Sequence, residues 1–174
     1  SALDAKELAE AGFNGEQICE ILERVKMESS IYITVDTLKF LKKGGRITPA
    51  AAALGTLLHI KPVLQIQGEK LDSFSKVRTM KQARTTMLAA AEKDLKERFA
   101  DADAKNTWLF VAHTQNEEMA KEFVQEIEEH YPQAGTVYMA PLSLSIACHI
   151  GPGSLAVAMS KKLDIEAERK RYGL

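Results

Sequence analysis

The sequence predicts a two-layer α/β domain with a mixed, partly antiparallel sheet and helices mainly on one face. Along the 174 residues, segments with the composition of strands alternate with segments whose apolar residues recur at helical spacing. Two strand-like segments, 61–67 and 71–77, are separated only by Gly68, Glu69 and Lys70, which predicts an antiparallel hairpin. Strands and helices otherwise alternate, so the hairpin makes the predicted sheet mixed.

The first third of the chain is predicted to contain helices on both sides of one strand. The expected elements are a helix over 3–11, a helix that follows residue 14 and reaches about 27, a strand over 31–35, a turn of helix over 38–41 and a helix over 48–58. Gly12 can end the first helix, and Asn14 can cap the second. Gly44 and Gly45 stop the short turn, and the Thr-Pro pair at 48–49 favours a helix start.

The remaining elements alternate between strands and amphipathic helices. They are expected to be strands over 61–67 and 71–77, a helix over 80–99, a strand over 108–112, a helix over 116–130, a strand over 136–139, a helix or strand over 142–148 and a strand over 154–159. The run 108–112 is continuously apolar, which predicts a central strand. The tail from Asp164 is highly charged and is expected to be a helix or a frayed end.

Charge and hydropathy limit the classes of partner. The net charge is −1, from 23 basic and 24 acidic residues, so no overall field attracts nucleic acid or an anionic membrane. The most apolar stretch, 49–66, is interrupted by His59, Lys61 and Gln65 and falls short of a membrane span. No signal peptide is visible. The protein is therefore expected to be soluble and cytoplasmic, with no nucleic-acid partner and no membrane span.

Metal and nucleophile chemistry have little support. Cys19 and Cys148 lie far apart without metal-ligand spacing and are predicted to be reduced, mostly buried thiols. The four histidines show no metal pair. Ser143 and Ser145 lie near His149, but neither a nucleophile elbow nor an orienting acid is visible. The sequence also contains no P-loop and no dinucleotide fingerprint.

Three segments combine features that favour an anion. Residues 41–49 place two glycines and Arg46 beside a helix start, whose free N–H groups favour an anion. In 149–153 His149 precedes a Gly-Pro-Gly turn and could donate to a carboxylate or phosphate. The stretch 76–79 lies where a strand passes to a helix. Plainer interpretations stay open: a solvated helix-ending loop, a histidine bonded to a nearby carbonyl, and a solvated arginine.

Together these segments resemble the second domain of the DegV family. Residues 36–47, DTLKFLKKGGRI, resemble the signature that opens that domain, and 58–64 followed by Gly68 resembles its next motif. Residues 76–79 match the family's Lys-x-Arg-Thr stretch, and 149–153 match its His-x-Gly-Pro-Gly motif. Four motifs in the family's order make a specific match.

The resemblance implies lipid binding. DegV proteins hold a long-chain fatty acid between two domains, and many are the fatty-acid-binding subunit of bacterial fatty acid kinase. They present the carboxylate to a separate catalytic subunit, which makes acyl phosphate for phospholipid synthesis, and they are not themselves enzymes; no cofactor is implied. On this basis 1–28 would be the helical connection from a missing N-terminal domain, 29–162 the lipid-binding domain and 163–174 a charged tail.

Candidate residues for the anionic end follow from the same resemblance. His149, Arg46, Arg78, Gly45 and Gly151 would bind the fatty-acid carboxylate or face the kinase catalytic subunit. The sequence does not separate these two roles for the arginines.

An acyl chain needs a long apolar slot with one or two fixed donors at its mouth. The predicted helix over 50–58 and the strand over 63–66 could supply this slot, since small residues at 50–53 leave room for a tail. Close packing of helix on sheet would use small residues too. The candidate pocket residues are Leu54, Leu57, Leu58, Ile60, Val63, Leu64 and Ile66.

Two other functions stay open. The chain could be an enzyme subunit, a hydrolase or phosphotransfer partner that uses His149, or a purely structural or protein-interaction domain. Turnover of an acyl ester or phosphate would indicate the enzyme, whereas a fatty acid at near one per chain would indicate the carrier. A carrier module without its covering domain is also expected to expose an apolar surface and to associate with itself.

Overall fold

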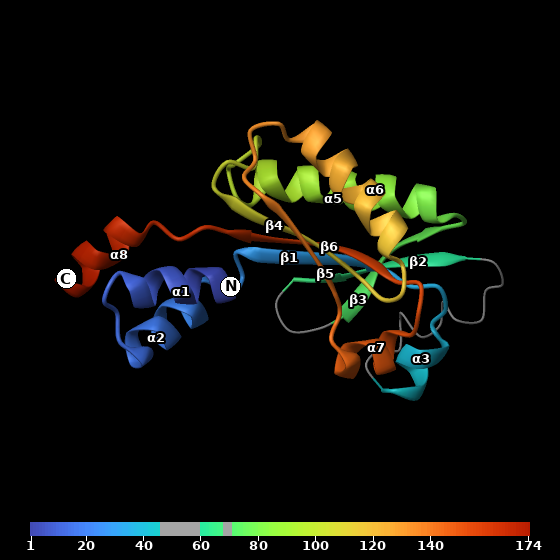
Figure 1. Ribbon diagram of the computed structural model, residues 1–174, viewed down its shortest axis with the longest axis horizontal. Coiled ribbons are helices and arrows are strands. Elements are labelled where there is room, and N and C mark those ends of the chain that lie inside the picture. Colours follow the sequence, from blue (N-terminus) through green and yellow to red (C-terminus); the bar gives the residue numbers. More distant parts are fainter. Residues whose placement is uncertain (46–59, 68–70) are drawn as a thin grey trace.

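The core of the protein is a mixed sheet, seen in a computed structural model that describes residues 1–45, 60–67 and 71–174. Within these residues six strands form one sheet in the order β3-β2-β1-β6-β4-β5 (Figure 1). The strands are β1 Ser29–Thr34, β2 Lys61–Ile66, β3 Leu71–Val77, β4 Thr107–His113, β5 Val137–Pro141 and β6 Leu155–Lys161. Neighbouring strands are antiparallel except β4 and β5, which are parallel. The predicted mixed sheet, with its β2–β3 hairpin, is confirmed.

Side-chain caps fix the starts of four of the described helices. The described helices are α1 Ala2–Glu10, α2 Gly15–Val25, α3 Lys39–Lys43, α5 Met80–Glu97, α6 Glu117–His130, α7 Leu144–Ile150 and α8 Ile165–Tyr172. Asn14 caps α2 in a capping box with Gln17, as the sequence predicts. Ser1 caps α1, Thr79 caps α5 and Asp164 caps α8, so each of these helices begins with one of its free N–H groups satisfied.

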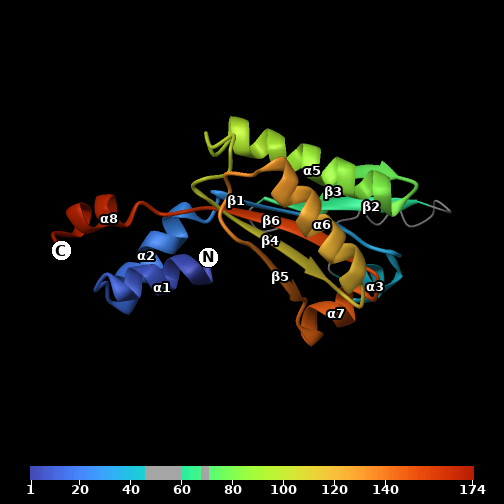
Figure 2. The same cartoon turned by 45° about the horizontal axis from the view of Figure 1, so that its top comes forward.

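The main core lies between the sheet and the helices α5 and α6, which cover one of its faces (Figures 1 and 2). Met87 and Leu95 of α5 and Phe123 and Ile127 of α6 are almost completely buried there. Alternate residues of the strands meet them, with Val157 of β6 among them. The apolar residues whose helical spacing predicted these two helices therefore lie on the helix faces that are buried against the sheet.

A buried carboxylate links α5 to the sheet. Oδ2 of Asp94 accepts hydrogen bonds from Ser30 Oγ at 2.6 Å, Tyr32 Oη at 2.7 Å and Gln67 Nε2 at 3.2 Å. Arg98 Nη1 lies 3.1 Å from the same oxygen and also bonds the Ser30 hydroxyl. Burial and the bond to Asp94 raise the pKa of the Tyr32 phenol. Four donors compensate the burial of this charge.

The opposite face of the sheet has a smaller core at one end. The helices α3 and α7 lie there together, below the sheet in Figure 1. The buried residues of this smaller core are Ile33, Val35, Leu38, Leu41, Leu64, Ile150 and Ala156. The two-layer arrangement with helices mainly on one face is therefore confirmed, with short helices added at one end of the other face.

The two ends of the chain pack together beyond the far end of the sheet. In both views α1, α2 and α8 form a group beside the sheet (Figures 1 and 2). The rings of Phe13 and Tyr172 contact edge to face, with centroids 5.7 Å apart. Trp108 Nε1 donates to the buried Asp4 carboxylate at 2.8 Å, which joins α1 to β4. The charged tail is a helix, one of the two outcomes that the sequence left open.

Some local expectations need correction. Both cysteines are exposed rather than buried, since Cys19 and Cys148 each lie two residues, or about 200° of helix, from a buried isoleucine. The segment 142–148 is mostly helix, in α7. The strand β4 has a neighbour on each side, but β1 and β6 are central. The expected helix over 48–58 lies outside the described residues. None of the described helices has the length and apolar character needed to span a membrane.

Candidate functional site

The described parts of the three anion-favouring segments lie at the same end of the sheet, on different strands. Thr34 at the end of β1 pairs with Val63 in β2 and with Leu155 at the start of β6. Lys61 at the start of β2 pairs with Val77 at the end of β3. The chain entering α3, the chain leaving β3 and the turn before β6 therefore lie at the same end.

His149 lies in the last turn of α7 and is partly buried against α3. A Cβ on Gly44 would lie 2.6 Å from His149 Nδ1, closer than such atoms approach, so the ring uses space that a glycine leaves open. Gly44 has ordinary helical angles, so this position requires the absence of a side chain rather than backbone freedom. None of the described residues hydrogen-bonds the imidazole, whose Nδ1 faces Gly44.

The turn after His149 requires glycine twice. Gly151 ends α7 with φ of +83°, and a Cβ there would overlap the ring of Phe40 in α3. Gly153 has φ of +79°, and its Cβ would lie 3.4 Å from Asp36. The Gly-Pro-Gly turn therefore places α7 directly against α3.

The charges beside His149 favour an anion. Asp36 forms an ion pair with Lys61, whose Nζ also lies 3.5 Å from the Asp36 carbonyl oxygen. Lys42 and Lys43 are exposed in the last turn of α3, next to Gly44. One negative and three positive groups leave a local excess of two positive charges, although the whole chain is nearly neutral.

The candidate acyl-pocket residues divide between the two faces of the sheet. Leu64 is buried in the smaller core, and the partly buried Ile60 packs against it. Ile66 is partly buried and pairs with Ile31. Val63 instead packs in the main core under α5, because neighbouring residues of a strand point to opposite faces. The structure therefore separates Val63 from Leu64, and we leave Val63 out of the proposed pocket.

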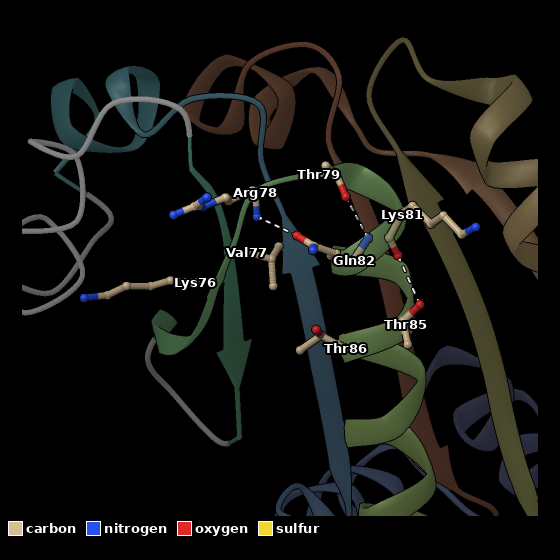
Figure 3. A pocket seen from close by; sticks show the side chains of 8 residues that line it. All are labelled: Lys76, Val77, Arg78, Thr79, Lys81, Gln82, Thr85 and Thr86. Atoms are coloured by element: carbon tan, nitrogen blue, oxygen red, sulfur yellow. Dashed lines mark hydrogen bonds between the residues drawn. The ribbon is translucent and has the colours of Figure 1, made fainter.

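Arg78 lies on a basic surface rather than in an anion cradle. Figure 3 shows Lys76 and Arg78 pointing to the same side, away from α5, whereas Lys81 points the other way. A pocket of about 810 Å³ lies between the end of β3 and the first turns of α5. The hydroxyl of Thr79 accepts from Gln82 N at 3.1 Å, and the Gln82 side chain accepts from Arg78 N at 2.9 Å. The helix start is thus already capped.

The structure does not bring Arg78 and His149 together. The strand order β3-β2-β1-β6 places the end of β3, just before Arg78, and the start of β6, which follows the His149 turn, three strand spacings, or about 14 Å, apart. Gly45 follows Gly44, the C-cap of α3, with φ of +63°, and a Cβ added there would meet no atom within 4 Å, so its role is conformational. Four candidate residues lie outside the described residues: Arg46, Leu54, Leu57 and Leu58.

Sequence reasoning missed two buried hydroxyls behind His149. Thr114 follows β4 and Ser154 precedes β6, and their oxygens lie 2.7 Å apart. The available signal was that both hydroxyls lie near the end of a predicted strand, Thr114 two residues after 108–112 and Ser154 as the first residue of 154–159. Polar residues at strand ends are, however, common in turns. Across the described ranges, no three His, Cys, Asp or Glu side chains are grouped to hold a metal ion.

Comparison with known proteins supports one family. The family model described as "Uncharacterised protein, DegV family" matches residues 1–162. The DegV domain-containing protein YqaC of Lactococcus lactis is 36% identical over 158 residues, which are 90% of this chain and 53% of that protein. The chain thus spans about half the length of the curated relatives it matches.

Two solved structures share the fold. The chain matches a DegV family protein from Thermus thermophilus, described by its fatty acid binding, with a TM-score of 0.79 and 31% identity, over 91% of this chain and 55% of that one. It matches a stearic acid-binding protein from Eubacterium ventriosum with a TM-score of 0.81 and 25% identity, over 95% of this chain and 55% of that one. The extent of the family match and the identity to YqaC show that this chain belongs to the DegV family.

Proposed function

We propose that the protein binds a long-chain fatty acid and presents its carboxylate to a partner kinase for acyl-phosphate formation in phospholipid synthesis. The observation that carries the proposal is the partly buried His149 imidazole, held against Gly44 at the edge of an apolar core. A ligand with an anionic head and an apolar tail fits this combination. The fatty-acid binding of the Thermus protein and the stearic acid binding of the Eubacterium protein support the same ligand class.

The acyl chain is proposed to lie on the sheet face that carries α3 and α7. Ile60, Leu64 and Ile66 contribute apolar surface there, and Leu54, Leu57 and Leu58 are proposed to complete it. Each buried methylene contributes about 0.8 kcal/mol, so the tail supplies most of the binding free energy. The carboxylate then needs only a few fixed donors, among which we place His149. Gly151, whose N–H already donates to the Ala147 carbonyl oxygen at 2.8 Å, is proposed to shape the turn beside the carboxylate.

The second half of the site is proposed to belong to a first domain, joined to this chain through residues 1–28. Relatives about twice as long as this chain support that arrangement. The two-domain protein is this chain together with that domain. In it, the lipid would lie between the domains, and the chain would act in the cytoplasm as a carrier rather than a catalyst.

The basic surface around Arg78 is proposed to face the kinase. Lys76 and Arg78 are exposed and project to one side, and they lie at the end of β3, which is three strands away from β6. Arg46, which lies outside the described residues, is proposed for the carboxylate or for the same surface. An exposed basic patch would steer an acidic partner.

Mass spectrometry of lipid extracted from the purified two-domain protein tests the proposal. We expect near one long-chain fatty acid per chain, and acyl phosphate only when a fatty acid kinase catalytic subunit and ATP are added. Arg78→Ala should lower acyl-phosphate output without releasing the lipid, whereas the exposed Lys93→Ala on α5 should change neither. Protein free of fatty acid, or turnover of an acyl ester or phosphate without the kinase, would overturn the proposal.

A further inference from the structure

We propose that Thr114 and Ser154 are positioning residues that hold His149 in place against Gly44. The two hydroxyls form a buried clasp behind the Gly-Pro-Gly turn. Thr114 is 5% exposed and Ser154 is fully buried. Thr114 lies just after β4 and Ser154 just before β6, so the clasp is built on two adjacent strands of the sheet.

Every hydrogen-bonding position of the Thr114 hydroxyl is used. Its single proton is donated to the Gly151 carbonyl oxygen at 2.6 Å. The oxygen accepts from the Ser154 backbone N–H at 3.1 Å. The Ser154 hydroxyl, 2.7 Å away, then donates to the second lone pair. The single proton and the two lone pairs of Thr114 therefore determine which group donates in each of the three hydrogen bonds. Hydrogen bonds also constrain orientation, whereas an apolar contact does not.

Backbone bonds reinforce the same connection. Gly153 N donates to the Thr114 carbonyl oxygen at 2.7 Å, and Thr114 N donates to the Ser154 carbonyl oxygen at 3.3 Å. Asn116 Nδ2 donates to the Gly153 carbonyl oxygen at 3.3 Å. The turn from Gly151 to Ser154 is therefore bound to the chain that leaves β4.

The clasp reaches His149 through one turn of helix. Gly151 N donates to the Ala147 carbonyl oxygen at 2.8 Å, which closes the last turn of α7 around His149. The helix has only seven residues, and Ser143 at its start makes no side-chain cap. Leu142 N, just before the helix, donates to the His113 carbonyl oxygen at 2.8 Å, so α7 is anchored at both ends and Gly151 provides the C-terminal anchor. A shift of Gly151 would carry the ring away from the opening left by Gly44.

The consequence for binding depends on the proposed function. If His149 binds a carboxylate, loss of the clasp misplaces that donor without removing it. Thr114→Val keeps the size of the side chain and removes its bonds, so we expect stearic acid affinity of the two-domain protein to fall about threefold to tenfold. In a His149→Ala background the same substitution should cause no further loss, because the ring through which it acts is absent.

The position of His149 itself is measured by NMR of the imidazole groups, without ligand. The spectrum of His149→Ala identifies the His149 signals. We expect Thr114→Val to shift those signals, Thr114→Ser to restore them, and the signals of the exposed His130 to stay in place. Ser154→Ala, which keeps the Thr114–Gly151 bond, should cause a smaller shift and serves if Thr114→Val fails to fold.

Thr107→Val is the matched control. Thr107 is also buried in β4 and donates to Asp101 Oδ2 at 2.7 Å, but it lies at the other end of the strand. Thr107→Val should reduce folding stability and leave the His149 NMR signals unchanged. Three results would each overturn the clasp. The His149 signals could stay in place in Thr114→Val, or they could shift equally in Thr107→Val. Thr114→Val could also cause the same loss of affinity with and without His149. A different result would separate the two claims. If His149→Ala binds stearic acid as tightly as wild type while the His149 signals still move in Thr114→Val, the carboxylate role of His149 is wrong and the clasp stands.

Discussion

The described helices cover the two faces of the sheet to different extents. On one face, α5 and α6 cover a continuous core, and Asp94 ties α5 to the first strand. On the other, the described helices α3 and α7 cover one end only. Beyond them, Phe110 and Tyr138 stack with centroids 5.5 Å apart, and Tyr138 is 38% exposed. The first face is a scaffold, whereas the second combines a small core, glycine-dependent contacts and accessible apolar surface.

This difference suggests a division of roles. A binding site needs surfaces that a ligand or a neighbouring domain can cover, and such surfaces contribute less to the stability of the chain alone. Substitutions in the main core should therefore change folding stability most, and substitutions around His149 should change binding more than their effect on folding explains.

Asp94→Ala should destabilise the protein by about 3–5 kcal/mol. The substitution removes the acceptor shared by Ser30, Tyr32 and Arg98 and leaves buried donors without a partner. Urea unfolding followed by circular dichroism measures the effect. Glu97→Ala, on the exposed side of the same helix, is the control and should cost little. A similar small cost for both would show that the buried network does not hold α5 to the sheet.

Gly151→Ala should destabilise by about 2–4 kcal/mol, from the left-handed backbone angle and the overlap with the Phe40 ring. Gly135→Ala is a matched control, because that glycine has no left-handed angle and its added Cβ would approach only the Lys162 ammonium, at 3.6 Å. The same urea titration compares the two. Equal midpoints would contradict the packing of α7 against α3.

Thr34→Val should stabilise the protein by about 1 kcal/mol. Thr34 is fully buried in β1, and its hydroxyl finds no hydrogen-bond partner among the described residues. Valine keeps the shape and removes the unsatisfied oxygen. Thr107→Val, which removes a partnered hydroxyl from β4, should have the opposite sign. A lower stability for Thr34→Val would indicate that the Thr34 hydroxyl is satisfied.

Tyr131→Phe should have the smallest effect at neutral pH, since the buried Tyr131 hydroxyl has no partner in the described part of the chain. Burial, with a further contribution from Glu92, raises the pKa of the Tyr131 phenol from 10.0 to about 12. A raised folded-state pKa gives a stabilising contribution that is complete below pH about 10 and is lost as the pH rises toward about 12. Wild type should therefore lose stability relative to Tyr131→Phe over that range. Parallel pH profiles from urea unfolding would contradict this.

Local sequence patterns were sufficient for most elements and insufficient for the site. Apolar periodicity and caps such as Asn14 depend on neighbouring residues, so they predict helices and strands directly. The separation of about 14 Å between the end of β3 and the start of β6 depends on the strand order, which no local pattern encodes. The alternation of a strand could have separated Val63 from Leu64 beforehand.

Close approaches were also beyond the sequence. The Gly-Gly pair predicted a helix end, which is correct, but Gly44 is required because the His149 ring occupies the space of its side chain. The clasp of Thr114 and Ser154 joins residues 40 positions apart, and only the pairing of β4 with β6 brings them together.

The most direct test of the account is the affinity of stearic acid for the two-domain protein, measured for wild type and His149→Ala. A charge-assisted hydrogen bond contributes about 1.5–3 kcal/mol, so the substitution should weaken binding about tenfold to a hundredfold. Binding should persist, because the buried tail supplies most of the free energy. His130→Ala, an exposed histidine at the end of α6, should bind like wild type. Equal affinities for wild type and His149→Ala would contradict the assignment of His149 to the carboxylate.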